Sequence, residues 1–433
     1  MECSGSDLAS VRAFLRASCD DDVLLDRLEV SYVQGGADGP VRVLYEGPGR
    51  NGDVLRLTAR RVKAAKGLEL ETAINARGTR PVVSTGFAQT AFYAPALDLL
   101  FQVFPTDDRL PSLPVAVDGA AMTPVLESVL APHAAGSRLQ SVTPRVMRYK
   151  PERKCLLRYD LAWCDGAPAA APRVVWARVA RRAKFERTRN ILPRVHPLSA
   201  GLGFELPEPL GVVPHLAMEL FGPVPGVALF ALVQQADFPA LCRRVGESLR
   251  RFHGLRVDVE EVLDLPAQIA RLEENAIEFG WMMPAERERI EVVKRELTAR
   301  LRALAPSPLR LIHRDFHGDN VLVADDRLVL LDFEDCAMGE PADDVGSNWA
   351  QLTWHEHRAG EQRALPEAAK RAFLEGYLEA ADPTTAACLP TYAAMHCFLY
   401  AHQCLRHPLE PARFDDARPM LAACEDVLEQ GLP

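Results

Sequence analysis

Apolar and polar residues follow two different periods along this chain, and the period changes near residue 237. Before that point, segments such as 145–149, 155–161 and 174–180 have the alternation and composition of strands, with turn residues between them. After it, apolar residues recur at helical spacing, first over residues 238–252. The pattern therefore predicts a β-rich region followed by a mostly helical one.

Residues 1–138 are expected to form a separate α/β domain. Strand-like segments at 41–45 and 54–59 flank the turn-rich EGPGRNGD, which is a hairpin signal. An apolar run at 97–104 leads into PTDDRLPSLP, whose prolines predict an extended connector. No group of candidate catalytic residues stands out in residues 1–138. The hairpin is similar to the later one at 145–161, either as a degenerate internal repeat or by chance.

Short strand-like runs interrupt the helical half of the chain. They cover residues 309–312, 321–323 and 328–331, and the polar letters HRDFHGDN separate the first two. Strands inserted among helices are an unusual local arrangement. We therefore expect any chemistry of this protein to lie in this segment.

The stretch LIHRDFHGDNVLV places His313, Asp315, His317 and Asp319 at every second position. On an extended strand these side chains would share one face, which would suggest a metal cluster and a hydrolase. Gly318 favours a turn instead, and as a loop the letters contain H-R-D-x-x-x-x-N, a pattern of phosphoryl transfer. A polar surface turn without chemistry is the third possibility.

Phosphoryl transfer needs a carboxylate to accept the proton of the nucleophile and hard oxygen ligands for Mg²⁺. Asp315 can supply the base, and Asn320 and Asp332 can supply the ligands. Asp332 follows an apolar strand that ends in LDFED at the right separation, which favours this chemistry over a surface turn. The sequence has no second His-rich cluster upstream, which counts against a metallohydrolase.

HRDFHGDNVLV, LDFEDCAMGEPADDVG and the spacing between them resemble the aminoglycoside phosphotransferase and choline kinase family. These are small-molecule kinases with a protein-kinase-like fold. The resemblance implies ATP and Mg²⁺ as cofactors, Asp315 as the catalytic base, and Asn320 and Asp332 as the metal ligands. It also implies that His313 braces the loop and that Asp344 hydrogen-bonds it.

The same resemblance assigns the hinge between two lobes to the segment PEPLGVVPHLAMELFGPVPG. Backbone groups near Glu219, Leu220 and Phe221 would then meet the adenine of the nucleotide. This segment agrees with the family in its order along the chain.

The nucleotide-binding part departs from the family at two points. The strand VVWARVA has Arg178 where the family has a lysine, with Glu186 as its candidate helix partner and Lys184 as a rival cation. The turn KPERK, with Arg153 and Lys154, stands where a glycine-rich loop is expected. That turn either lends positive charge to phosphate binding or is an ordinary exposed hairpin turn.

We therefore expect an α+β chain with a bilobal protein-kinase-like fold. The β-rich N-lobe with its hinge would cover residues 139–222 and the helical C-lobe residues 223–433, preceded by the α/β domain of residues 1–138. The expected function is ATP-dependent transfer of the γ-phosphoryl group to a hydroxyl of a sugar, aminocyclitol or amino alcohol.

Two other functions compete with this one. The departures at Arg178 and KPERK keep open a pseudokinase or a nucleotide-binding regulatory module, although Asp315, Asn320 and Asp332 are all present. A protein kinase is disfavoured, because Glu334 replaces the glycine of D-F-G and no A-P-E segment follows.

An acceptor amine could be held by aromatic and acidic residues after position 346, which could equally be core and surface residues: Trp349, Trp354, Glu356, Asp415 and Asp416.

Composition narrows the setting of this chemistry. The 433 residues are 48% hydrophobic and 25% charged, as in globular proteins of two or three domains, and the net charge of −9 argues against nucleic-acid binding. There is no signal-peptide pattern and no uninterrupted apolar span of roughly 20 residues, so we expect no membrane partner. Ten cysteines without a C-x-x-C pair suit a reducing cytoplasm, and nothing in the sequence indicates an oligomeric state.

Overall fold

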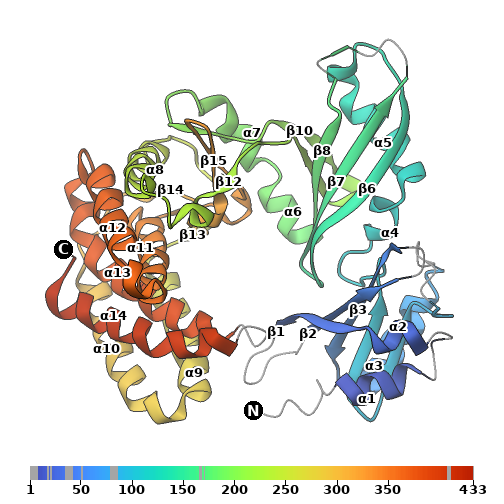
Figure 1. Cartoon of the computed structure of the whole chain (residues 1–433), viewed down its shortest axis with the longest axis horizontal. Coiled ribbons are helices and arrows are strands. Elements are labelled where there is room, and N and C mark those ends of the chain that lie inside the picture. Colours follow the sequence, from blue (N-terminus) through green and yellow to red (C-terminus); the bar gives the residue numbers. More distant parts are fainter. Residues whose placement is uncertain are drawn as a thin grey trace. The chain divides into compact units, whose positions relative to one another are not determined.

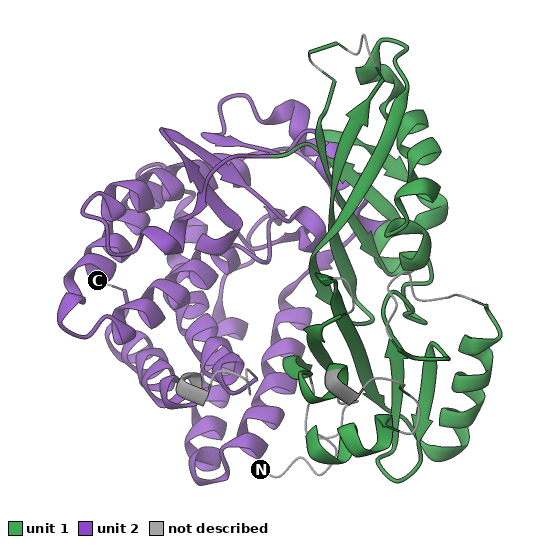
Figure 2. Cartoon of the chain, turned by 45° about the vertical axis from the view of Figure 1, so that its right-hand side comes forward, with its two compact units in different colours: residues 1–186, 209–223 green, residues 187–208, 224–433 purple. Residues whose placement is uncertain are grey.

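The computed structural model describes most of the chain as two compact units (Figure 2). One unit comprises residues 1–186 and 209–223, and the other comprises residues 187–208 and 224–433. The described residues are 8–16, 19, 22–34, 42–49, 52–78, 86–164, 168–169, 171–406 and 411–432. The division into the three domains expected from the sequence stays a prediction.

The first unit begins with a five-stranded antiparallel sheet of strand order β1-β2-β3-β5-β4 (Figure 1). Its strands are β1 (Glu29–Gln34), β2 (Arg42–Pro48), β3 (Val54–Arg61), β4 (Ala91–Ala94) and β5 (Leu99–Val103). Its helices are α1 (Leu8–Leu15), α2 (Asp22–Asp26) and α3 (Ala64–Asn75). The hairpin predicted around EGPGRNGD is confirmed as β2–β3, with residues 41, 50 and 51 outside the described part of the chain.

Alternation along these strands gives the first sheet two covered faces. Val43 and Tyr45 point to one face and pack with Leu15 of α1. Tyr93 and Ile74 pack on the other face, which α3 covers.

A second antiparallel sheet follows in the same unit, with strand order β10-β11-β8-β7-β6. Its strands are β6 (Leu139–Lys150), β7 (Lys154–Trp163), β8 (Val174–Ala180), β10 (Pro209–Val213) and β11 (Met218–Phe221). Helices α4 (Leu113–Ala116), α5 (Gly119–Ala134) and α6 (Arg182–Thr188) accompany it. Although the sequence assigns residues 119–134 to the first domain, α5 shares its core with this second sheet.

The segment PTDDRLPSLP is not the extended connector that its prolines predicted. Consecutive turns occupy it, with Thr106 N–H donating to Val103 and Leu110 N–H donating to Asp107. The Asp107 carboxylate also accepts the backbone N–H groups of Arg109 and Leu110, at 2.8 and 3.1 Å. This local side-chain capping folds the segment back on itself.

The second unit is mostly helical, as predicted. Its longer helices are α8 (Phe238–His253), α9 (Leu265–Met282), α10 (Arg287–Ala303), α11 (Ala342–Arg358), α12 (Ala364–Leu378), α13 (Pro383–Leu405) and α14 (Ala417–Gln430), with the short α7 (Ile191–Val195) before them. Two small sheets interrupt the helices: β12-β15-β16-β9 and β13-β17-β14. Their strands are β9 (Phe204–Glu205), β12 (Val227–Ala228), β13 (Val262–Leu263), β14 (Arg310–Ile312), β15 (Val321–Ala324), β16 (Arg327–Leu330) and β17 (Ala337–Gly339).

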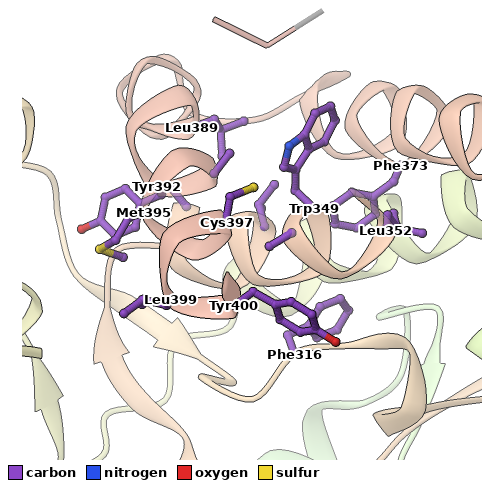
Figure 3. Packing of buried hydrophobic residues seen from close by; sticks show 14 of the residues in the cluster. Phe316, Trp349, Leu352, Phe373, Leu389, Tyr392, Met395, Cys397, Leu399 and Tyr400 are labelled. Atoms are coloured by element: carbon purple, nitrogen blue, oxygen red, sulfur yellow. The ribbon is translucent and has the colours of Figure 1, made fainter. Parts of the chain in front are cut away.

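One large apolar core holds the second unit together, and Figure 3 shows part of it. Helices α8 and α12 approach closely at Gly246, where an added Cβ would lie 2.2 Å from the carbonyl oxygen of Phe373. Phe316, the residue after Asp315, is fully buried in the same core. The mixed α/β first unit and the helical second unit agree with the α+β class predicted. Among the described residues, no helix is long and apolar enough to cross a membrane.

Candidate active site

The segment between β14 and β15 is a loop rather than a strand. Residues 318–320 form a 3₁₀ turn, which confirms the turn favoured by Gly318. His313 is fully buried whereas Asp315 is exposed, so the alternating side chains do not share one face. The metal cluster suggested by a strand is therefore wrong, because Arg314 has a left-handed φ of 66° that breaks the alternation.

The side chain of Asp344 holds this loop by binding backbone N–H groups of the loop. Its carboxylate accepts hydrogen bonds from the backbone N–H groups of His313 at 2.6 Å and of Arg314 at 2.7 Å. The same carboxylate lies 3.0 Å from Nε2 of His253, whose Nδ1 lies 2.8 Å from the hydroxyl of Tyr377. Burial raises the pKa of Tyr377, and the nearby Asp344 charge adds to this, so the phenol stays neutral. Asp344 thus fixes the strained Arg314 from the first turn of α11, where a carboxylate is also favoured.

His313 links the loop to the strand that precedes Asp332. Its Nε2 lies 2.7 Å from the carbonyl oxygen of Leu331 and must donate, since a carbonyl only accepts. The N–H of Leu331 in turn donates to the carbonyl of Asn320 at 2.9 Å, which extends the β15–β16 ladder by one step. Asn320 and Asp332 therefore lie at the same end of this hairpin. Asp332 has a left-handed φ of 60°, a second strained residue at this end.

Asn320 also contacts Asp315. Its Nδ2 donates to the Asp315 carbonyl at 2.9 Å and lies 3.3 Å from Oδ2 of the same residue. The amide nitrogen is therefore used within the loop, which turns the amide oxygen to other partners. His317 and Asp319, which the sequence treats as turn residues, meet where Nδ1 of His317 accepts the N–H of Asp319 at 3.2 Å.

Arg178 lies opposite Glu219 on neighbouring strands of the second sheet. Its Nη2 and Nε lie 2.6 and 3.0 Å from Oε2 of Glu219, and both side chains are about nine-tenths buried. Leu220 and Phe221 follow Glu219 on β11. Glu186, the helix partner suggested by resemblance, forms an ion pair with Arg182 one turn earlier in α6.

The KPERK turn is not the ordinary exposed hairpin turn that was one of its two interpretations. Pro151 and Glu152 are buried, whereas Arg153 is exposed and Lys154 is half-buried. Lys154, the first residue of β7, lies opposite Lys150, the last residue of β6. Lys150 is a further cation beside this turn that the sequence analysis did not single out. Leu156 lies opposite Arg178 on the neighbouring strand, and residues two apart on a strand point to the same face. Lys150, Lys154 and Arg178 therefore share one face of the sheet.

The residues proposed to hold an acceptor amine already bind cations of the chain itself. Lys370 lies 4.8 Å from the ring centre of Trp349 and forms an ion pair with Glu356, which also pairs with Arg363 at 3.0 Å. Burial opposes ionisation of Glu356, but Lys370 and Arg363 outweigh it and lower the pKa of this carboxyl. Trp354 donates to Asp416 at 2.8 Å. These contacts favour the structural interpretation of Trp349, Trp354, Glu356 and Asp416, and the fifth residue of that set, Asp415, is exposed.

Sequence reasoning missed the polar cluster at Asp343. This fully buried carboxylate accepts from Gln268 at 2.8 Å and lies 2.9 Å from Nε2 of His396 and 3.5 Å from Arg271. Burial alone would raise the pKa of Asp343, but His396, Arg271 and Gln268 lower it overall. The adjacent acids Asp343 and Asp344 were the available signal, because consecutive helix residues point in different directions and both of these side chains are buried. Across the described ranges, no three His, Cys, Asp or Glu side chains are grouped so as to hold a metal ion.

Comparison with known proteins places this geometry in a family. The family model of the phosphotransferase enzyme family matches residues 160–395, more than half of the chain. The chain therefore belongs to the phosphotransferase enzyme family. A search of curated proteins found no match.

Solved structures of low sequence identity have similar folds. A glucosamine kinase is 17% identical, with a TM-score of 0.52 over 94% of this chain and 95% of that one. Aminoglycoside phosphotransferase APH(4)-Ia, in a complex with ADP and hygromycin B, is 16% identical with a TM-score of 0.46 over 72% and 99% of the two chains. A choline/ethanolamine kinase family protein from Mesorhizobium loti is 19% identical, with a TM-score of 0.43 over 63% and 85%. The protein-kinase-like fold predicted from the sequence is confirmed, and the glucosamine kinase match extends beyond the residues 160–395 that the family model covers.

Proposed function

We propose that this protein is an ATP-dependent small-molecule kinase. It transfers the γ-phosphoryl group of ATP to a hydroxyl of a sugar, an aminocyclitol or an amino alcohol. One observation carries the proposal: a single short hairpin gathers Asp315, Asn320 and Asp332, and Asp344 holds the backbone beside Asp315.

Asp315 is assigned the role of catalytic base. Its side chain is about half exposed, so an acceptor hydroxyl can reach it, while the neighbouring Phe316 is anchored in the core. The carboxylate would orient the hydroxyl and accept its proton as the new P–O bond forms. Asn320, His313 and Asp344 act on this step only by fixing the loop from which Asp315 projects.

Asn320 and Asp332 are assigned to Mg²⁺. An amide oxygen and a carboxylate are the hard ligands this ion prefers, and the hydrogen bonds within the loop involve the Asn320 nitrogen rather than its oxygen. Two protein ligands suffice, because Mg²⁺ bound with nucleotides keeps waters and phosphate oxygens. When bound, the ion would neutralise charge on the phosphates.

The nucleotide itself is assigned to the second sheet of the first unit. Arg178, Lys154 and the exposed Arg153 would meet the phosphates, and backbone groups of Glu219, Leu220 and Phe221 would meet the adenine. Arginine can replace lysine here because it is a permanent cation with a bidentate fork. The Arg178–Glu219 pair is also the observation that best supports the competing function, a pseudokinase, since it engages this cation within the protein.

An acceptor panel separates the two functions. The protein is incubated with γ-labelled ATP, Mg²⁺ and aminoglycosides, amino sugars, neutral sugars, choline and ethanolamine, and labelled products are separated. A kinase labels at least one acceptor and shows an ATP-induced thermal shift that EDTA removes. A pseudokinase binds nucleotide and labels none. If Asp332 binds the ion, Asp332→Asn should raise the Mg²⁺ concentration that is needed for the half-maximal thermal shift with ATP.

A further inference from the structure

A buried ion cluster joins the N-terminal domain to the KPERK turn within the first unit. Glu152, at the tip of this turn, is only 3% exposed. Its Oε2 lies 2.8 Å from Nε of Arg42, and its Oε1 lies 3.0 Å from Nε of Arg60. Arg42 on β2 and Arg60 on β3 are cross-strand partners, so one face of the N-terminal hairpin supplies both cations.

The backbone of Glu152 is held as firmly as its carboxylate. Its N–H donates to Oδ2 of Asp107 at 2.8 Å, and the hydroxyl of Tyr149 donates to the same oxygen at 2.8 Å. The carbonyl of Glu152 accepts from Nε of Arg181. Asp107 is itself only 2% exposed and belongs to the folded segment that follows β5. We call Glu152, Arg42, Arg60, Asp107 and Arg181 the Glu152 clamp.

The clamp fixes a backbone conformation that the turn would not choose alone. Glu152 has a left-handed φ of 59°, which is unfavourable for a residue with a long side chain. Pro151 before it has a fixed φ, so the turn lacks the freedom of a glycine-rich loop. Its shape is therefore set by contacts with residues far away in the sequence.

The clamp also decides which charges the turn can offer. The carboxylate of Glu152 points into the protein, where arginines neutralise it, while Arg153 is exposed and Lys154 pairs with Lys150 at the base of the turn. If Glu152 left the clamp, a carboxylate would join the turn that is proposed to meet the phosphates. Repulsion between that carboxylate and a polyphosphate would weaken nucleotide binding.

We propose that Glu152 is a positioning residue through which contacts with residues 42, 60 and 107 fix the shape of the phosphate-side turn. This inference gives residues 1–138 a role in nucleotide binding, and it rests on the function proposed above. Glu152 does not touch the reacting atoms in this account. Its effect should fall on the affinity for ATP rather than on the chemical step.

Glu152→Gln tests the clamp with the full chain. The amide keeps the size of the side chain but leaves Arg42 and Arg60 without their shared charge, so the turn should loosen. We expect the KM for ATP to rise about tenfold with kcat changed by less than about threefold, since only nucleotide binding is altered. Amide hydrogen exchange of residues 150–154 should accelerate at least about tenfold.

A matched control is available on the same hairpin. Glu46 pairs with Arg56 at 2.7 Å between β2 and β3, so Glu46→Gln makes the same chemical change in an ion pair outside the Glu152 clamp. It should leave both the KM for ATP and exchange at residues 150–154 within about twofold of wild type. Arg42→Met should reproduce Glu152→Gln from the other side of the pair, and the double variant should be no worse than either single one.

Hydrogen exchange separates this inference from the proposed function. If the wild type labels no acceptor, the kinase proposal fails, whereas faster exchange of residues 150–154 in Glu152→Gln would still show the clamp. Unchanged exchange there, or an ATP dependence no different from that of Glu46→Gln, overturns the inference. If Glu152→Gln does not fold, Arg42→Met gives the same two readouts, and a wild-type result for it has the same consequence.

Discussion

Arg178 donates from Nη2 and Nε to Oε2 of Glu219, at 2.6 and 3.0 Å, across two neighbouring strands. The pair explains how a permanently charged side chain is itself kept about nine-tenths buried on the half-buried face of the sheet. It also means that Arg178, which is expected to replace the lysine of the family, already has an anionic partner on the proposed hinge strand.

Removing this cation should destabilise the first unit. Arg178→Met leaves the Glu219 carboxylate buried and uncompensated, which should lower the free energy of unfolding by about 3 kcal/mol. Arg178→Lys keeps the charge but loses the fork, so the loss should be about 1 kcal/mol. Urea denaturation measures both. Arg145→Met, which breaks an exposed ion pair with Asp160 on the same sheet, should cost less than about 1 kcal/mol, and equal losses for the two methionine variants would contradict the account.

Asp344→Asn should disable catalysis without touching substrate. An asparagine can offer one acceptor oxygen, but its NH₂ group would face a backbone donor of His313 or Arg314, so the loop would shift. We expect kcat to fall about 100-fold with nucleotide affinity retained, as judged by steady-state kinetics and calorimetry. Tyr377→Phe removes the hydroxyl beside His253 and keeps the Asp344 carboxylate, so it should retain kcat within about threefold. A full loss of activity in Tyr377→Phe would mean that the whole polar chain, rather than Asp344, controls the loop.

The turn at residues 318–320 was predictable because it follows from neighbouring residues. Gly318 and the short strands on each side determine the turn, and the partner strand lies a few residues further on. The alternation of His313 and Asp315 predicts a shared face only if the segment is an extended strand. A left-handed Arg314 destroys that periodicity, and no residue type at this position announces it.

The partners of Arg178 and Glu152 could not be predicted in the same way. Glu219 follows Arg178 by 41 residues, and only the register of β8 against β11 brings them together. Glu152 meets Arg42 across 110 residues, and Asp107 lies in a proline-rich segment that reads as a connector. Such contacts depend on how sheets are assembled, which the local pattern of polar and apolar residues does not encode.

The Glu356 ion cluster should make stability depend on pH in the acidic range. Lys370 and Arg363 hold the pKa of Glu356 below its ordinary value of 4.5 against the effect of burial, so the unfolded chain binds the proton more readily. Its contribution is complete above about pH 4.5 and is lost as the pH falls below that value. At pH 7, Glu356→Gln should lower the free energy of unfolding by about 2 kcal/mol, and this difference should shrink below pH 4.5.

An exposed pair on the neighbouring helix face serves as the control for this titration. Glu375 of α12 pairs with Arg243 at 2.9 Å, and both side chains are substantially exposed. Urea unfolding of Glu375→Gln between pH 3 and 7 should run nearly parallel to wild type, because exposed pairs contribute little. If Glu356→Gln also ran parallel to wild type, the buried cluster would not be the source of the pH dependence.

The rate of phosphoryl transfer by Asp315→Ala tests the central claim most directly. It is measured with the best acceptor of the panel under saturating Mg²⁺ and ATP, together with nucleotide affinity by calorimetry. We expect a fall in kcat of about 1,000-fold with the affinity for ATP within about threefold of wild type, since Asp315 is exposed, lies beside Asn320 and acts on the acceptor proton. Transfer at the wild-type rate in Asp315→Ala would contradict the assignment of the base and, with it, the proposed mechanism.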